Sequence, residues 1–145
     1  MRKLLILAFG ILALSSCGPS SLYYWGEDFS NTLIYDRITY RNFKDQTPES
    51  ICSMVAGFEE IINNPGGERE VVPPGVCAEY GYLLMQPTTA EYFAKYATSG
   101  QKKLFSGTDY GTLFMEKGKE LLQKELELYP ESSVFILPLV NKLNK

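Results

Sequence analysis

The chain has 145 residues, with 14 Lys and Arg against 17 Asp and Glu, a formal charge of −3 and no histidine. This length suffices for one domain with a real core, and the acidic balance argues against nucleic-acid binding, which depends on basic side chains that neutralise phosphates. The lack of histidine excludes Ser-His-Asp and Cys-His catalytic arrangements and removes the commonest metal ligand. Because no CxxC pair or phosphate-binding glycine loop is present either, we expect no catalytic residue, no metal site and no cofactor, and so no enzyme.

The N-terminus has the pattern of a bacterial lipoprotein signal. Arg2 and Lys3 precede a short apolar run over residues 4–14, which is too short to span the core of a bilayer. The run ends in the sequence LSSC at residues 14–17, which matches the lipobox of bacterial lipoproteins closely. We therefore predict a signal peptide at 1–16 and a diacylglycerol on the Cys17 thiol. The alternative is an ordinary cleaved signal peptide followed by an incidental cysteine.

Cleavage would change the charge and the organisation of the chain. Without residues 1–16, 129 residues remain, with 12 basic and 17 acidic side chains and a formal charge of −5. The mature chain then divides into a lipidated cysteine, tether and aromatic patch at 17–27 and a single helical domain at 28–145. Membrane attachment is expected through the lipid on Cys17 and not through surface charge. Gly18 stands where inner-membrane lipoproteins of enteric bacteria carry aspartate, which favours the outer membrane, on its periplasmic side.

Turn-rich breaks divide the mature chain into helical segments. The clearest helix start is at Thr47 and Pro48, where threonine can cap the helix and proline can occupy its first position. Gly81 and Gly118 each lie on an apolar helix face, at a cost of about 1 kcal/mol in helix propensity, which predicts a close helix crossing. The expected helices are one capped by Asp28 or Ser30 and running to about Arg41, one from Pro48 to Ile62, one from Val76 to Met85, one from Thr88 or Thr89 to Tyr96 and closed by Ser99 and Gly100, one from about Thr108 or Asp109 to Tyr129, and one from Val134 to Leu143 that Pro138 kinks or shortens.

The predicted fold class is all-α, because no convincing strand pair can be found. The alternation of helices and turns suggests stacked, tetratricopeptide-like helical hairpins with about five to six helices, although no clean 34-residue repeat is present. Cys52 and Cys77 lie near the starts of successive helices, and therefore at opposite ends of an antiparallel pair. Their separation, on the order of 10–15 Å, exceeds the Cα distance of about 7 Å that a disulfide allows. We expect two buried free thiols.

Five residues are candidates for an interaction site. Tyr23, Tyr24 and Trp25 form an aromatic patch that either packs the tether against the helical core or docks a partner close to the membrane, because Tyr and Trp are favoured interface anchors. Glu79 and Tyr80 follow a Pro-Gly turn at a helix start and allow the same two interpretations. Helix start and close packing explain most of this second group, and Glu79 can interact with the first turn of its own helix.

Two other features allow both a structural and a chemical interpretation. Glu59 and Glu60 are adjacent carboxylates, but neighbouring helical residues point about 100° apart, so a solvated helix edge is the better interpretation than an acid–base pair. A second set of side chains is aromatic and either extends the core or lines a ligand groove. This set consists of Tyr92, Phe93, Tyr96, Phe105 and Tyr110.

Three stretches resemble a family of small bacterial lipoproteins of unknown function. They are Tyr23–Gly26 soon after the lipidated cysteine, Pro73–Leu83, and Tyr129–Ser132. The resemblance implies tetratricopeptide-like helices, and it implies an envelope partner similar to the lipoprotein of the curli secretion channel, beside which members of the family are often encoded. The chain departs from the family pattern at 88–106, which is longer and more aromatic. The resemblance brings no catalytic residues with it.

These observations predict a membrane-anchored lipoprotein that faces the periplasm and acts as a non-catalytic helical adaptor or assembly factor in an envelope complex. The competing hypothesis is a ligand-binding lipoprotein whose aromatic pocket is built by the stretch from Tyr92 to Tyr110. A hydrolase would need a site based on Asp, Glu or Ser, and the sequence reveals none.

Overall fold

The computed structural model describes residues 20–27 and 32–143, and this part of the chain is all-α, as predicted. Within it there are seven α-helices and no strand, so the expectation of five to six helices is close. Two isolated β-bridges are the only extended pairings among these residues. The elements are α2 (Ile34–Asp45), α3 (Pro48–Asn63), α4 (Val76–Leu84), α5 (Pro87–Tyr96), α6 (Ser99–Lys102), α7 (Tyr110–Leu128), the 3-10 helix η1 (Pro130–Ser132) and α8 (Ser133–Leu143).

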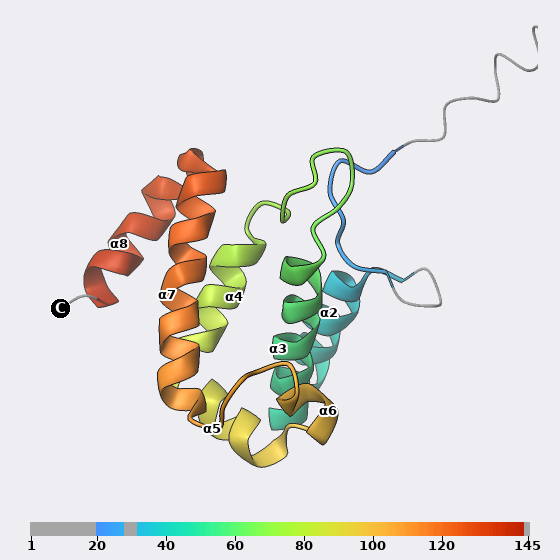
Figure 1. Cartoon of the computed structure of the whole chain (residues 1–145), viewed down its shortest axis with the longest axis vertical. Helices are drawn as coiled ribbons and strands as arrows, with labels where there is room; N and C mark the ends of the chain where they lie inside the picture. The colour runs from blue at the N-terminus through green and yellow to red at the C-terminus, as the bar shows by residue number, and fades with distance from the viewer. Residues whose placement is uncertain (1–19, 28–31, 144–145) are drawn as a thin grey trace, which may run out of the picture.

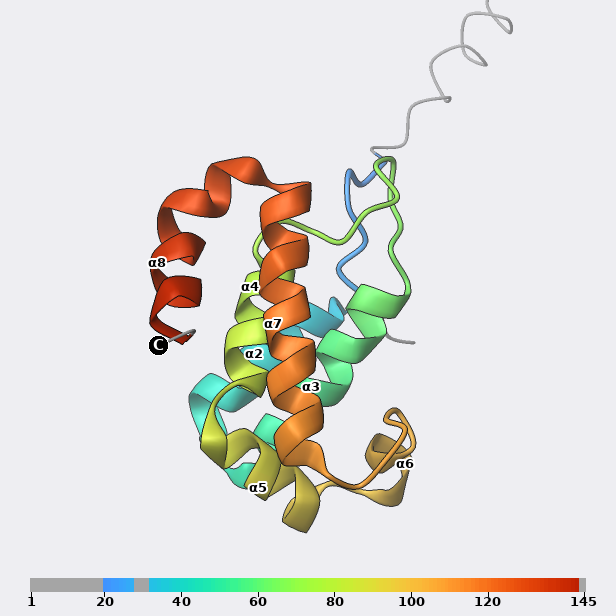
Figure 2. The same ribbon diagram turned by 60° about the vertical axis from the view of Figure 1, so that its left-hand side comes forward.

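The helices form a row with α8 at one end and α2 at the other, as Figure 1 shows. Along the row α2 packs on α3, α3 on α4, α4 on α7 and α7 on α8. Helices α5 and α6 lie beneath the row in Figure 1, across the lower ends of its helices, and α5 contacts both α3 and α7. The turned view in Figure 2 keeps α8 on the outside of the molecule. Tetratricopeptide-like stacking of these helices stays a prediction. None of the described helices is long and apolar enough to cross a bilayer.

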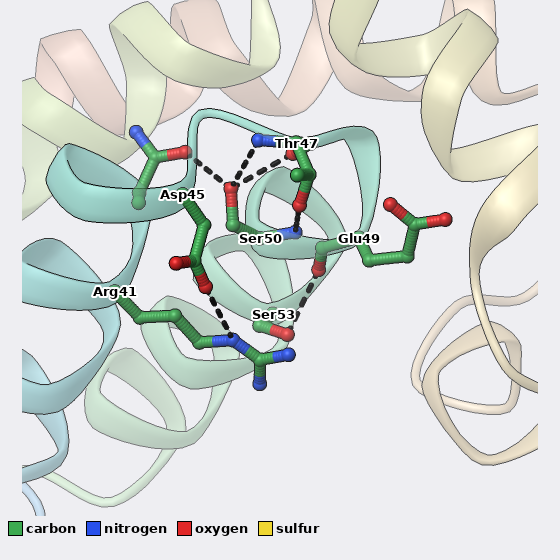
Figure 3. Close-up of polar contacts among 7 residues, drawn as sticks. Arg41, Asp45, Thr47, Glu49, Ser50 and Ser53 are labelled. Atoms are coloured by element: carbon green, nitrogen blue, oxygen red, sulfur yellow. Dashed lines mark hydrogen bonds and ion pairs between the residues drawn. The ribbon is translucent and has the colours of Figure 1, made fainter.

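The strongest helix starts lie where the sequence places them. Thr47 Oγ1 accepts a hydrogen bond from the Ser50 amide at 3.1 Å, and Ser50 Oγ accepts one from the Thr47 amide at 3.1 Å, which makes a capping box (Figure 3). Asp109 caps α7 through the Thr112 amide at 3.3 Å. The predicted caps Asp28 and Ser30 lie outside the described residues.

One expected helix end differs in the structure, and a proline expected to kink or shorten a helix does not shorten it. Ser99 and Gly100 were expected to close a helix, but α5 ends at Tyr96, and both residues belong to the short helix α6. Thr98 caps α6 in a capping box with Gln101, and this local hydrogen bonding outweighs the turn propensity of the Ser-Gly pair. Pro138 lies inside α8, which continues through it to Leu143.

The helix crossing predicted at two glycines is confirmed. Helices α4 and α7 approach so closely that a Cβ built on Gly81 would lie 2.8 Å from the Gly118 carbonyl oxygen. A Cβ on Gly118 would lie 2.9 Å from the Gly81 carbonyl oxygen and 2.4 Å from Met85 Cγ. Because backbone lies against backbone here, neither glycine can gain a side chain without moving a helix.

The main core cluster contains part of the aromatic stretch of the sequence, and a smaller second cluster holds α8. Phe93 is fully buried, with ring centroids 5.3 Å from Phe105, 5.1 Å from Tyr110 and 5.2 Å from Phe114. Phe93 meets each of these rings edge to face, which is a geometry that aromatic pairs prefer. Phe93, Phe105 and Tyr110 therefore extend the core, which was one of the two interpretations, whereas Tyr96 is 37% exposed and lies at the surface.

The two cysteines of the helical domain are buried free thiols, as predicted. Cys52 is 1% exposed and Cys77 is 0% exposed. Burial raises the pKa of both thiols, that of Cys77 to about 11.

Candidate functional site

The segment that follows the predicted lipidation site is bound to the helical domain by its backbone. The Tyr24 amide donates to the Gly66 carbonyl at 3.2 Å, and the amides of Glu68 and Arg69 donate to the carbonyls of Ser21 and Leu22 at 3.0 and 3.1 Å. Residues 20–25 therefore lie along the loop that leads from α3 to α4, as both ribbon views show. We call residues 20–27 the docked segment.

A glycine makes this docking possible. Gly67 adopts φ +77°, a conformation that side chains rarely accept, and a Cβ there would lie 2.7 Å from the Leu22 carbonyl oxygen. Gly66 receives the Tyr24 side chain, whose Cβ would stand 3.1 Å from a Cβ built on Gly66. The consecutive glycines after Pro65 thus give the docked segment room to approach the backbone of this loop.

Trp25 and Glu79 are brought together through Tyr35. The half-buried Trp25 ring meets the Tyr35 ring edge to face, with centroids 5.0 Å apart. Tyr35 donates its hydroxyl proton to both carboxylate oxygens of Glu79, at 2.9 and 3.0 Å. Burial, with the negative charge of Glu79 beside it, raises the pKa of Tyr35 to about 12, so the hydroxyl remains a donor. Tyr35 carried no sequence signal of this role.

Tyr23 and Tyr24 contact the domain at separate points. The Tyr23 ring lies edge to face on Tyr129 at 6.5 Å, and the Arg69 guanidinium lies 5.7 Å from the Tyr23 centroid and donates to its hydroxyl at 3.2 Å. Tyr129 donates to the Val72 carbonyl at 2.6 Å, and burial raises the pKa of Tyr129 above its usual value. These contacts support the interpretation that the aromatic patch packs the tether against the helical domain. Docking of a partner by the same patch stays a prediction.

Tyr80 lies in the core, at 0% exposure, and offers no surface to a partner. Its ring stacks on Phe58 with centroids 5.2 Å apart, and its hydroxyl donates to Glu59 Oε1 at 2.5 Å. Burial and the Glu59 carboxylate raise the pKa of Tyr80 well above its usual value, which keeps the proton on the hydroxyl.

Glu59 corrects the expectation of a solvated helix edge. Only Glu60 is exposed, whereas Glu59 is 2% exposed. Its carboxylate forms an ion pair with Lys117 Nζ at 2.6 Å and accepts from Asn63 Nδ2 at 3.1 Å. The missed signal is that position 59 falls four residues after Val55 on the apolar stripe of α3, where a carboxylate needs a partner.

A second buried carboxylate, also missed, ties α7 to α4. Glu125 is 1% exposed and accepts hydrogen bonds from the Gly75 amide at 2.8 Å and the Ala78 amide at 3.3 Å. Gly75 is the N-cap of α4 and Ala78 lies in its first turn, where backbone amides have no hydrogen-bond partner within the helix. A side chain from another helix supplies that partner. Gly75 itself, at φ +86°, supplies no side-chain cap.

A groove of about 390 Å³ lies between α2 and α3, and two of its lining residues, Arg41 and Ser53, are drawn in Figure 3. Its floor includes Ile34 and Ile38, and its rim carries both signs of charge, with Arg41 and Glu60 among the lining residues. Arg41 Nε lies 3.6 Å from the Asp45 carboxylate. Nothing here resembles a catalytic constellation. Among the described residues, no group of three or more His, Cys, Asp and Glu side chains could hold a metal ion.

Comparison with known proteins adds no relative. No protein-family model, no curated protein and no solved structure matches the chain. The resemblance of its motifs to small bacterial lipoproteins therefore stays a prediction.

Proposed function

We propose that this chain is a lipid-anchored lipoprotein of the bacterial outer membrane that faces the periplasm and acts as a non-catalytic helical adaptor in an envelope complex. The observation that carries the proposal is the LSSC lipobox ending at Cys17, after a basic start and a short apolar run. Gly18, in place of the aspartate of inner-membrane lipoproteins, supports the outer membrane as the location.

The docked segment supports a role close to the membrane. Cys17 precedes Ser20 by three residues, so even a fully extended chain would hold Ser20 within about 11 Å of the lipidated residue. From Ser21 onward the backbone is hydrogen-bonded to the domain. An anchor this short keeps the domain against the bilayer, where it can meet only partners that lie in or near the membrane.

The partner we propose is a lipoprotein similar to the curli secretion channel, as the motif resemblance implies. The aromatic rings at residues 93–114 pack against one another, which gives more support to an adaptor than to an aromatic ligand pocket. Glu79, exposed at the start of α4 and held by Tyr35, and the half-buried Trp25 are the residues we expect nearest to that partner.

Acyl labelling tests the anchor. In cells given a labelled fatty acid, the wild-type chain should incorporate label and fractionate with the outer membrane. Cys17→Ala should remain an unprocessed precursor without label. Normal maturation and fractionation of Cys17→Ala would refute the lipoprotein assignment.

A comparison of two measurements tests the docking surface. Trp25→Ala should reduce co-purification of partners from membranes more than it lowers the melting temperature of the domain. Phe43→Ala, at an exposed aromatic residue of α2 away from the docked segment, is the matched control. A loss of several kcal/mol in unfolding free energy, typical of a truncated buried tryptophan, would assign Trp25 to the core and refute the docking role.

A further inference from the structure

Helix α8 turns an apolar face to solvent at one end of the helix row. The exposed fractions are 74% for Val134, 80% for Phe135 and 47% for Leu137, and Pro138 is exposed as well. On the opposite side of the helix, Ile136 is buried and anchors α8 to the domain. Figures 1 and 2 both show α8 on the outside of the row. Contiguous exposed apolar residues of this kind mark interaction surfaces.

Within η1 and the described part of α8, one acidic and one basic side chain stand near opposite ends of this face. Glu131, in η1, directly precedes α8, and Lys142 lies in the last turn of α8; both are exposed. No residue of α8 is acidic. The 100° step of α8 places Val134, Phe135, Pro138 and Lys142 on one side of the helix, and Glu131 stands in η1 directly before the N-terminal end of α8. We call these five residues the α8 stripe. Along the chain it is acidic, then apolar, then basic.

We propose that the α8 stripe binds the α8 stripe of a second copy of this chain, with the two helices antiparallel around a twofold axis near Phe135 and Pro138. In this arrangement each Glu131 lies opposite Lys142 of the second copy, and the apolar residues between them cover one another. A parallel pair would instead place Glu131 opposite Glu131 and Lys142 opposite Lys142. The stripe is therefore self-complementary in the antiparallel sense, as a twofold interface requires.

The size of the stripe sets the strength of this contact. Helix α8 has 11 residues and is about 16 Å long, so a pair of such helices buries less than the roughly 1,200 Å² typical of a stable interface. Self-association should therefore be weak in free solution. Copies held at one membrane have a much higher effective concentration, which makes a weak contact effective. This last step rests on the proposed lipid anchor.

Crosslinking in membranes tests the pairing with the full chain. Two differently tagged copies are co-expressed, one with Glu131→Cys and one with Lys142→Cys, and membranes are treated with a short bis-maleimide. We expect the two tags to be linked. When both copies carry Glu131→Cys, or both carry Lys142→Cys, the yield should fall several-fold, because like positions lie at opposite ends of an antiparallel pair. Cys52 and Cys77 are buried and give the same background in every sample.

Two further variants separate the α8 stripe from general crowding. Phe135→Glu, added to both crosslinking copies, should lower the yield about tenfold or more, because it buries a charge at the centre of the contact. Phe43→Glu on α2, where the phenylalanine is 79% exposed, is the matched control and should leave the yield unchanged.

Several outcomes would overturn the proposal. Equal yields for all cysteine combinations, or a yield that ignores Phe135→Glu, would refute antiparallel pairing. Absence of crosslinks, together with weaker binding of the Phe135→Glu chain to vesicles of phosphatidylethanolamine and phosphatidylglycerol, would assign the stripe to lipid. Acyl labelling of the same samples shows whether the chains are anchored. Labelled chains without crosslinks refute the pairing alone. Chains without label keep a free Cys17 thiol, so in that case a higher yield for the mixed 131/142 pair than for the like pairs supports the pairing and refutes the anchor.

Discussion

Replacing Lys117 with alanine should destabilise the domain by about 3 kcal/mol, because it leaves the Glu59 carboxylate buried without its counter-charge. Loss of one partner of a buried ion pair costs about 3–5 kcal/mol. The lower end applies here for two reasons. Tyr80 and Asn63 still donate to Glu59 in the variant, and the Lys117 side chain is 27% exposed, so water can reach the space that it leaves.

Urea denaturation of residues 18–145, followed by far-UV circular dichroism, measures this change. With a slope of roughly 1.5 kcal/mol per molar urea, a loss of about 3 kcal/mol lowers the midpoint by about 2 M. Lys119→Ala, at an exposed position of the same helix, is the matched control and should stay within about 0.5 kcal/mol of the wild type.

The double variant Glu59→Gln/Lys117→Met separates charge from packing. It removes both charges while keeping side-chain volume, so it should be clearly more stable than Lys117→Ala. If Lys117→Ala costs no more than Lys119→Ala, the ion pair contributes nothing and the account of Glu59 is refuted.

Three other predictions concern the helix crossing, a helix cap and a thiol. Gly118→Ala should cost about 1–3 kcal/mol by overpacking against the neighbouring backbone, whereas Gly111→Ala on the same helix should be neutral or slightly stabilising; equal midpoints in urea would contradict the crossing. Thr47→Ala should cost about 1 kcal/mol through loss of the capping box, and Thr47→Ser should restore most of it in the same assay. Because burial raises the pKa of Cys77 to about 11, its thiol should not react with Ellman's reagent at pH 8 until urea unfolds the chain; mass spectrometry of a fast native adduct at Cys77 would show that the site opens.

The sequence predicted what depends on neighbours along the chain. The start of α3 at Pro48 and the length of α7 follow from local caps and helical spacing, and both are confirmed. The crossing at Gly81 and Gly118 was also predictable, because a missing side chain on an apolar stripe has few explanations other than close packing.

What the sequence did not reveal depends on partners far along the chain. Glu59 looks like a surface residue until Lys117 from α7 is placed beside it, and Glu125 looks solvated until it meets the first turn of α4. Local signals cannot rank such pairings, because the cost of burying a carboxylate depends strongly on whether a partner from another helix is present. The same holds for Tyr35, whose role follows from its contacts with Trp25 and Glu79.

The cap that Glu125 supplies has a consequence for the order of folding. Helix α4 has nine residues, too few for a stable isolated helix, and its first amides are satisfied by a side chain near the C-terminal end of α7. Until α7 has been synthesised and has packed, the first turn of α4 lacks its side-chain cap. A polypeptide that ends before residue 125 should therefore have an uncapped α4 that is more open to proteases than in the whole chain.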